Sequence, residues 1–486
     1  MFCNGILAYI IVIYMKLHIV ILLVSLSLIG CNDKTADAGD YAFIGGEIVN
    51  PNNDYIMLYN PKAESDTLHL DQHNRFSFKV KDLTPGIYTF THGGEYQMLL
   101  LEVNDSIMFR LNTVDFDESL VYTGLGAKKN NFLIKTFLDN EIDNKKLTKY
   151  CQMEPEDFMK HVDSSMFSRI QELDKFIQHK SPSDLFIKIA KTSINYNYYA
   201  NKEIYPFGYY GNNKLIHFKD LPEGFYDFRN EVDYNMEDLN EFYVYNRFLF
   251  SHFNNLALEK YYSVNGHDTA FDRESLAYNL GKLDLIDSLI VQKKIKNYLL
   301  KHTARDFIIH SLDKEEIDSI LSSYTSKCTN SEDKSEIVQL VASIEKLQTG
   351  YNVPNVAVVN YNGKTTDLHS IISRPTVIYF WSSNFKMNYR NSHSKVKKLK
   401  AKYPTIDFIA INVNDDDEMY WKKTLEKFNF PTENEYQFKE PTKAHNSLVV
   451  NSVSKVIIVN KNMTIIDANT NMFTSKFEEH LKKLNK

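Results

Sequence analysis

The chain has 486 residues, which suggests about two to four domains, and 43% of them are hydrophobic, as in ordinary globular proteins. Tyrosine and phenylalanine are numerous, with 31 residues each, and they predict aromatic-rich cores or surfaces. The formal net charge of −6 gives no electrostatic basis for binding nucleic acid, and the sequence contains no nucleic-acid-binding motif, so this class of partner is excluded.

The N-terminus is organised like a secretory signal. Met15 and Lys16 are followed by an apolar run at 19–28 and then by small residues, which is typical of an export signal with a cleavage site. The sequence Leu-Ile-Gly-Cys at 28–31 resembles a bacterial lipobox. This resemblance implies a signal peptide at 1–30, cleavage after Gly30 and a diacylglycerol on the Cys31 thiol. The expected localisation is the cell envelope of a Gram-negative bacterium, with the membrane as a partner through the lipid.

Residues 1–14 do not fit this scheme, because they are largely apolar and precede the basic residue. Either Met15 is the true start, or an uncleaved membrane anchor runs from Ile6 to Gly30. A lysine in the middle of a membrane span is costly, so we prefer the lipoprotein interpretation. The polar residues 31–40 then form a tether that has no capacity for a core.

The chain has four cysteines, and two of them are accounted for by this N-terminal scheme. Cys3 would leave with the signal and Cys31 would carry the lipid, so Cys151 and Cys328 remain. They are far apart in the sequence, and two unpaired thiols are the preferred interpretation. A single disulfide and a redox pair across two helices are the alternatives.

Short alternating stretches separated by turn residues predict an antiparallel β-sandwich at 41–126. His73 and His92 stand alone there, and we interpret them as satisfied histidines. The order Gly-Glu-Ile, Asn-Arg-Phe, Pro-Gly-Ile-Tyr and Thr-Gly-Leu-Gly resembles the small β-domain that precedes a thioredoxin-like domain in envelope lipoproteins. The expected strands are 42–49, 55–59, 65–70, 76–80, 86–91, 97–103 and 106–111.

Residues 127–350 are predicted to be mainly α-helical, because their apolar residues recur at helical spacing. Many tyrosines lie at 196–210. They could form a sugar- or peptide-binding surface, but packing between helices is the preferred interpretation. The region is either a scaffold or a partner-binding surface. The expected helices include 185–199, 236–253, 276–301, 303–311, 314–322 and 331–347.

Residues 351–486 begin a different pattern. A buried strand at 377–381 leads through a polar loop into a Lys-rich helix that ends at Lys402. Strands at 406–413, 455–459 and 465–468 follow, with helices at 419–428 and 475–484. The order of elements and the Phe380-Trp381 pair resemble the thioredoxin fold of membrane-anchored thiol–disulfide proteins. The expected fold class is therefore multidomain: an N-terminal antiparallel β-sandwich, a mainly α-helical middle and a C-terminal α/β thioredoxin fold.

The positions that define this family carry other residues. The resemblance places Cys-x-x-Cys at 385–388, where this chain has Phe385, Lys386, Met387 and Asn388. It places a cis-proline at Ser454. A cis bond before a residue other than proline costs about 3 kcal/mol, so we expect a trans peptide there. Disulfide exchange needs an attacking thiolate and a resolving thiol, so the domain is predicted to be redox-inactive.

The polar residues around this loop offer no complete alternative site. Ser382 and Ser383 have no base in sequence proximity, and His393 lies on the following helix. The acidic run at 414–418 is interpreted as a helix start, since it lacks the glycine and distal glutamate of a calcium loop. We expect no catalytic residue, metal or cofactor.

The preferred function is an envelope lipoprotein whose degenerate thioredoxin-like domain acts as a binding or scaffold module for a protein, peptide or glycan. One alternative is a periplasmic thiol–disulfide oxidoreductase that uses Cys151 or Cys328. The other is a glycan- or peptide-binding lipoprotein that uses the aromatic residues at 196–210.

Overall fold

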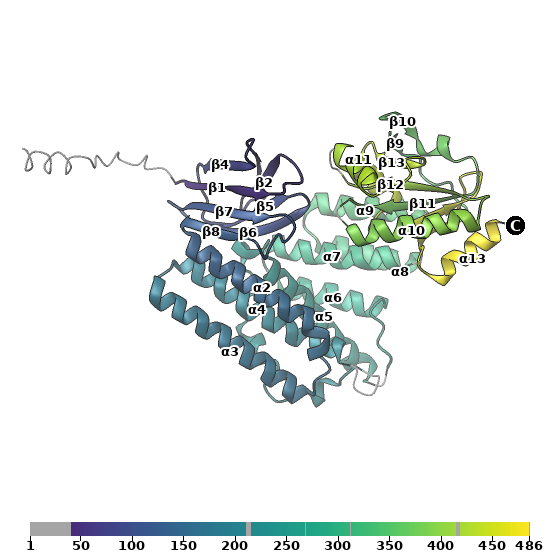
Figure 1. The fold of residues 1–486 in the computed structure, drawn as a ribbon. Coiled ribbons are helices and arrows are strands. Elements are labelled where there is room, and N and C mark those ends of the chain that lie inside the picture. The colour runs from purple at the N-terminus through teal and green to yellow at the C-terminus, as the bar shows by residue number, and fades with distance from the viewer. Residues whose placement is uncertain are drawn as a thin grey trace, which may run out of the picture.

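The computed structural model describes residues 40–209, 215–267, 269–311, 313–383, 385–414 and 418–485 (Figure 1). The predicted signal peptide, Cys31 and all but the last residue of the predicted tether lie outside the described residues. Within the described ranges, no helix is both long enough and apolar enough to cross a bilayer.

The N-terminal end is a β-sandwich of two four-stranded sheets, which confirms the predicted fold class. One sheet has the order β4-β1-β7-β8 and the other the order β3-β2-β5-β6. All pairs are antiparallel except β1 with β7, which run parallel. The strands are β1 (Ala42–Val49), β2 (Tyr55–Tyr59), β3 (Ser65–His69), β4 (Arg75–Val80), β5 (Gly86–His92), β6 (Glu95–Leu101), β7 (Ser106–Asn112) and β8 (Val121–Leu125).

The sandwich core follows from the two-residue period of its strands. In β7, Ile107, Phe109 and Leu111 are buried and the residues between them are exposed. Phe109 stacks on Phe90 of the other sheet, with ring centroids 4.7 Å apart. The sequence did not predict β8, because only Tyr122 of its five residues is buried, so its hydrophobic alternation is weak.

The middle of the chain is helical and lies beneath the sandwich, extending to the C-terminal domain (Figure 1). Several predicted helices have wrong boundaries. The helix expected at 185–199 continues to Gly208, the one at 314–322 continues to Lys327, and 303–311 is the last part of a helix that starts at Lys293. The expected helix at 276–301 is two helices, since the Gln292 side chain caps a new helix by accepting from Ile295 N at 2.7 Å. The expected helix at 236–253 starts only at Tyr243, after a short 3-10 turn at Glu237–Leu239. The helices are α2 (Ala127–Tyr150), α3 (Pro155–Lys180), α4 (Asp184–Gly208), α5 (Tyr243–Asn265), α6 (Leu276–Leu289), α7 (Lys293–His310), α8 (Lys314–Lys327) and α9 (Ser331–Glu345).

The tyrosines of α4 pack inside the helical region. Tyr196, Tyr198, Tyr199 and Tyr205 are each at most 7% exposed. The packing interpretation of this segment is therefore confirmed for the described part, and these rings do not form a surface for a ligand. Tyr210 lies outside the described residues.

The C-terminal domain is built on a seven-stranded sheet with the order β10-β9-β13-β12-β11-β14-β15. The strands β13, β12 and β11 are parallel and the remaining pairs are antiparallel. The sequence did not predict β10, β13 or α12. The elements are β9 (Ala357–Asn360), β10 (Thr365–Asp367), β11 (Thr376–Trp381), α10 (Lys386–Lys402), β12 (Asp407–Asn412), α11 (Glu418–Lys427), β13 (Glu435–Phe438), α12 (Pro441–Leu448), β14 (Lys455–Val459), β15 (Ile465–Asn471) and α13 (Ser475–Leu484).

The two faces of this sheet belong to different hydrophobic cores. In β11, Val377, Tyr379 and Trp381 join a core with side chains of α10, α11 and α13. Ile378 and Phe380, on the opposite face, belong to the large core that continues through the helices of the middle region. The C-terminal domain therefore shares buried apolar surface with the helical region.

Candidate functional site

The loop between β11 and α10 is the position that the sequence predicted for a degenerate redox site. Phe385 is the residue before the helix and is 58% exposed, and Met387 is 71% exposed. Lys386 is exposed, and Asn388 is half-buried with its Oδ1 atom unpaired among the described residues. None of the four side chains carries a thiol, and this helix end presents two apolar side chains, an ammonium group and an amide to its surroundings.

Ser454 stands at the turn before β14. No peptide bond in the described part of the chain is cis, so the bond before Ser454 is trans, as expected. Its hydroxyl lies 2.8 Å from that of Ser452, and its N–H donates to Ser452 Oγ at 3.2 Å. Ser452 and Ser454 are thus hydrogen-bonded to each other within the turn.

His393 does not serve as a base for the neighbouring serines. Its Nδ1 lies 2.7 Å from the Tyr389 carbonyl oxygen, which can only accept, so Nδ1 carries a proton. Its Nε2 lies 2.9 Å from Glu435 Oε1. One proton is held between these two atoms, so both ring nitrogens are engaged away from the serines.

Glu435 of β13 lies beneath the loop, inside the domain. The side chain is 4% exposed, and Trp381 donates its Nε1–H to Glu435 Oε2 at 3.2 Å. Burial raises the pKa of Glu435, and this effect exceeds the opposing hydrogen bonds from His393 and Trp381. The His393 ring also stacks on Phe430 at 4.1 Å, so this pair is enclosed by aromatic side chains. Glu435 therefore loses its proton less readily than an exposed glutamate does.

The two described cysteines are free and buried. Cys151 follows α2 and is 1% exposed, and Cys328 follows α8 and is 2% exposed. Burial raises the pKa of the Cys151 thiol to about 12, which leaves almost no thiolate at neutral pH. The disulfide that the sequence left open is not formed. Residues 415–417 of the acidic run lie outside the described residues.

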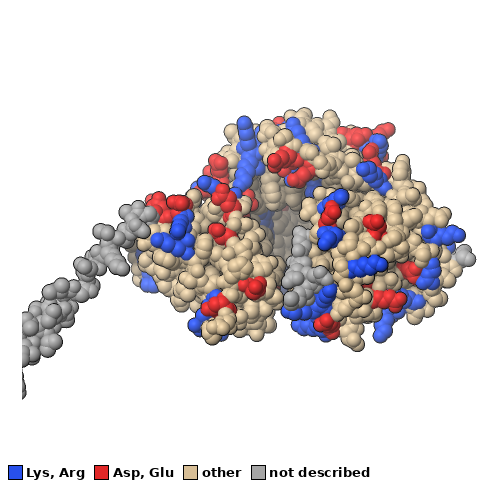
Figure 2. Space-filling model, turned by 90° about the horizontal axis from the view of Figure 1, so that it is seen from above, with Lys and Arg blue, Asp and Glu red and all other residues tan. Residues whose placement is uncertain are grey.

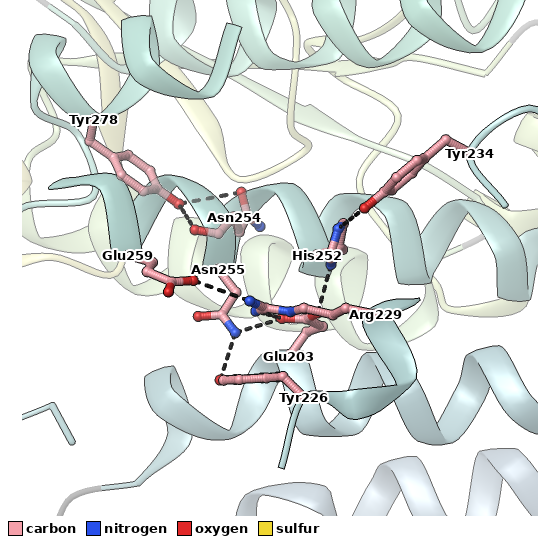
Figure 3. Close-up of polar contacts among 9 residues, drawn as sticks. All are labelled: Glu203, Tyr226, Arg229, Tyr234, His252, Asn254, Asn255, Glu259 and Tyr278. Atoms are coloured by element: carbon pink, nitrogen blue, oxygen red, sulfur yellow. Dashed lines mark hydrogen bonds and ion pairs between the residues drawn. The ribbon is translucent and has the colours of Figure 1, made fainter. Parts of the chain in front are cut away.

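A buried polar cluster in the helical region was not predicted from the sequence (Figure 3). Glu203 of α4 is fully buried and accepts from Arg229 through Nε at 2.9 Å and Nη2 at 2.7 Å. Its Oε1 lies 2.6 Å from His252 Nδ1, and Asn255 Nδ2 donates to Oε2 at 2.5 Å. The Arg229 guanidinium stacks on the Tyr226 ring at 3.7 Å.

This cluster joins three segments that are distant in the sequence. Glu203 lies on α4, Arg229 on the 3-10 segment Asp227–Glu231, and His252 on α5. The pKa of Glu203 is lowered, because hydrogen bonds from His252 and Arg229 exceed the effect of its burial. All of its lone pairs are used by the protein, so the arrangement is that of a structural clamp. No sequence motif could have revealed it.

His92 is also accounted for by the protein. It is 2% exposed, its Nε2 accepts from Asn52 N at 3.0 Å, and its Nδ1 lies 2.9 Å from the Tyr55 carbonyl oxygen. Burial lowers the pKa of His92, consistent with a neutral ring. The satisfied-histidine interpretation is confirmed for His92. His92 also lines a hollow of about 640 Å³ together with Tyr420 and Lys423 of the C-terminal domain. Figure 2 shows a hollow between the sandwich and the C-terminal domain.

A second opening lies between the sandwich and the helices. It has a volume of about 590 Å³ and is lined by five consecutive residues of β6 with one side of α2 and parts of α4 and α5. A neighbouring hollow of about 660 Å³ shares Ile87, Tyr96, Met98 and Tyr243 with it. We call the two together the β6 groove. Its residues come from segments that are far apart in the chain, so the sequence alone did not predict it.

Comparison with known proteins identifies the C-terminal fold. Residues 373–465 match a family model described as thioredoxin-like, so the C-terminal domain is a thioredoxin-like domain. The thioredoxin domain of a thiol–disulfide oxidoreductase from Bacteroides vulgatus is 14% identical, covering 29% of this chain and 99% of its own, with a TM-score of 0.25. A thiol:disulfide interchange protein from Bacteroides sp. is 16% identical, covering 29% of this chain and 93% of its own, with a TM-score of 0.25. No curated protein matches the chain.

Proposed function

We propose that the chain is an envelope lipoprotein whose thioredoxin-like domain does not exchange disulfides and serves as a scaffold for a binding surface elsewhere in the molecule. The observation that carries this proposal is the occupation of the two redox positions by Phe385 and Asn388. Neither side chain can form a thiolate or a mixed disulfide. Ser454, with a trans peptide before it, supports the same conclusion from a separate segment.

The scaffold role is supported by the way the domain is packed. One face of its sheet shares a continuous core with the helical region, so separating the two parts would expose that apolar face to water. The helix α12 of the domain also contacts α9 of the middle region. The domain therefore has a structural role that does not require redox chemistry.

The oxidoreductase alternative would need Cys151 or Cys328 as the nucleophile. Reactive thiols are partly exposed and have lowered pKa values. Both of these thiols are buried, and the pKa of Cys151 is raised. The glycan alternative based on the 196–210 aromatics loses most of its surface, because four of the tyrosines are at most 7% exposed and the described Phe207 and Tyr209 are half-buried.

An insulin-reduction assay tests the proposal directly. The full chain in detergent should give no turnover above the rate of a Cys151→Ser/Cys328→Ser double variant. A clear excess over that control would overturn the proposal. A Cys31→Ser variant tests the anchor in parallel, since it should move the chain from the membrane fraction to the soluble fraction of expressing cells.

A thiol titration gives an independent measurement. The difference between the wild type and the same double variant isolates Cys151 and Cys328 from the other cysteines. A thiol pKa near 12 in place of about 9 reduces the thiolate fraction at pH 8 roughly a thousandfold, so Cys151 should react with an aromatic disulfide only after denaturation. Rapid reaction of a native thiol would favour the oxidoreductase.

A further inference from the structure

The strand β6 is an edge of its sheet, and one end of that edge is already occupied by a side chain. Leu100 N donates to Asn130 Oδ1 at 2.7 Å, and Asn130 Nδ2 donates to Leu100 O at 2.9 Å. A residue of a neighbouring strand would make this same pair of bonds. The carboxamide of Asn130, held on α2, therefore takes the place of one residue of an added strand.

The rest of the edge is open. Antiparallel pairing alternates, so if the backbone of Leu100 points away from β5, the backbones of Met98 and Tyr96 do so too. The Met98 N–H donates to the Gln97 side chain at 2.8 Å. Within the described residues, no hydrogen-bond partner exists for the carbonyl of Met98 or for either backbone group of Tyr96.

This open edge faces the β6 groove. Two hollows of about 590 and 660 Å³ lie along this edge, and Tyr96 and Tyr243, which line both, are 54% and 46% exposed. On the helical wall of the groove, Asn144 and Asn197 bond to each other at 3.2 Å, yet Asn144 Oδ1 and Asn197 Nδ2 keep no partner among the described residues. Free backbone groups beside aromatic and amide side chains suit an extended polypeptide, which supplies alternating donors and acceptors.

The charge in the groove is mainly negative. Glu95, Asp117 and Glu141 line its first opening, together with the cation Lys145. Burial, together with the negative charge of its neighbour Asp117, raises the pKa of Glu95. Burial also raises the pKa of Asp117. A cationic group between the two would relieve both effects, so a basic side chain fits this wall.

We propose that the edge of β6 binds an extended polypeptide segment of a partner protein as an added strand, with a basic side chain of that segment placed near Asp117 and Glu95. This inference rests on the proposed binding role and names its ligand class. It does not depend on the redox state of the C-terminal domain, so the insulin assay and the peptide assay can fail separately.

The probe is an end-blocked, fluorescently labelled hexapeptide, Thr-Val-Thr-Lys-Val-Thr, measured by anisotropy with the full chain in detergent. Replacing its Lys by Glu should weaken binding about tenfold, as expected for the loss of one good charge contact. Two N-methylated forms of the peptide test the strand geometry, one methylated on its odd-numbered amides and the other on its even-numbered amides. An added strand uses only one of these two sets of amides for hydrogen bonds to β6. One methylated form should therefore bind about tenfold or more weakly than the parent peptide, and the other about twofold or less.

The matched protein variants are Tyr96→Pro and Tyr96→Val. Proline removes the edge N–H and is tolerated on edge strands, whereas valine keeps the N–H and the strand preference. Both lose the tyrosine ring, so the proline variant should bind at least about fivefold more weakly than the valine variant. The variant Asp117→Asn can still accept the hydrogen bond from the Gln97 side chain but has lost its charge. It should therefore bind the Lys-containing and the Glu-containing peptides with more similar affinities.

Equal binding of the two N-methylated peptides would overturn the proposal. This comparison uses the wild-type chain, so it remains decisive even if the proline variant does not fold. No binding by any hexapeptide, or binding of maltohexaose or cellohexaose without binding of the peptide, would overturn it as well.

Discussion

Two buried glutamate–histidine pairs, one in the helical region and one in the thioredoxin-like domain, have similar geometry and opposite electrostatics. Glu203 lies 2.6 Å from His252 and Glu435 lies 2.9 Å from His393, and both carboxyl groups are nearly inaccessible. The pKa of Glu203 is lowered, whereas that of Glu435 is raised.

The difference comes from the other neighbours of each acid. Glu203 also accepts two hydrogen bonds from the Arg229 guanidinium, which is a permanent cation. Glu435 has the neutral indole N–H of Trp381 in that place. The pKa of a buried acid is lowered where a fixed cation in direct contact offsets the desolvation of the carboxylate, and it is raised where no such contact balances the burial.

The largest effect is expected from Arg229→Met. This change leaves the charge of Glu203 buried with His252 and Asn255 as its remaining partners. Breaking a buried ion pair in this way costs about 3–5 kcal/mol, so the free energy of unfolding should fall by about 4 kcal/mol in urea denaturation. The matched control is Lys188→Met, which removes the exposed ion pair with Asp238 and should change little. A similar loss in both variants would contradict the clamp.

Replacing each acid by its amide sharpens the comparison. Glu203→Gln leaves the Arg229 cation without its buried counter-charge and should cost about 3 kcal/mol. Glu435→Gln removes an acid that holds its proton more tightly than usual, and the amide oxygen can still accept from Trp381, so about 1 kcal/mol is expected. Equal losses in urea denaturation would show that the two environments do not differ as proposed.

The smallest expected effect is a pair of opposite pH dependences. The stability that Glu203 contributes is present above its usual pKa of 4.5 and is lost as pH falls through its lowered folded-state pKa. Glu435 behaves in the opposite way: as pH rises from 4.5 through its raised folded-state pKa, its ionisation destabilises the fold. A tenfold difference in proton affinity between the folded and unfolded states corresponds to about 1.4 kcal/mol of unfolding free energy.

Urea titrations from about pH 3 to pH 7 measure these slopes. The difference in unfolding free energy between the wild type and Glu203→Gln should shrink toward low pH. The difference between the wild type and Glu435→Gln should change in favour of the variant as pH rises above 4.5. Parallel slopes for the two variants would refute the assignment of opposite pKa changes.

The sequence indicated the three-part organisation because its signals are local. Alternation predicted the strands of the sandwich, with Ile107, Phe109 and Leu111 as one face. Helical spacing predicted the middle region, although it ran through the break at 290–292, because the residues there continue the apolar pattern. The element order predicted the thioredoxin fold. Aligning a single motif with the family pattern was enough to predict that Phe385 and Asn388 stand at the two cysteine positions.

The sites depended on contacts that no local pattern records. The sequence singled out 385–388 and Ser454, and the structure describes them as a largely exposed helix start and a self-satisfied turn. The sequence did not single out Tyr96 or Asn130, because a residue in a strand and an asparagine in a helix are each ordinary features. They became candidates only because the structure places both along the edge of β6.

The sequence by itself determined the order of the domains and most of the secondary structure, though not β8, β10, β13 or α12, since its signals depend on the identity and spacing of nearby residues. Only the tertiary structure decided which buried acid has a lowered pKa, which has a raised pKa, and which strand edge is open. Both depend on what surrounds a group in space: Arg229 reaches Glu203 across 26 positions of the chain, and Asn130 reaches Leu100 across 30. The residues at 385–388, which the sequence singled out by resemblance, lie at the N-terminal end of α10 in the structure.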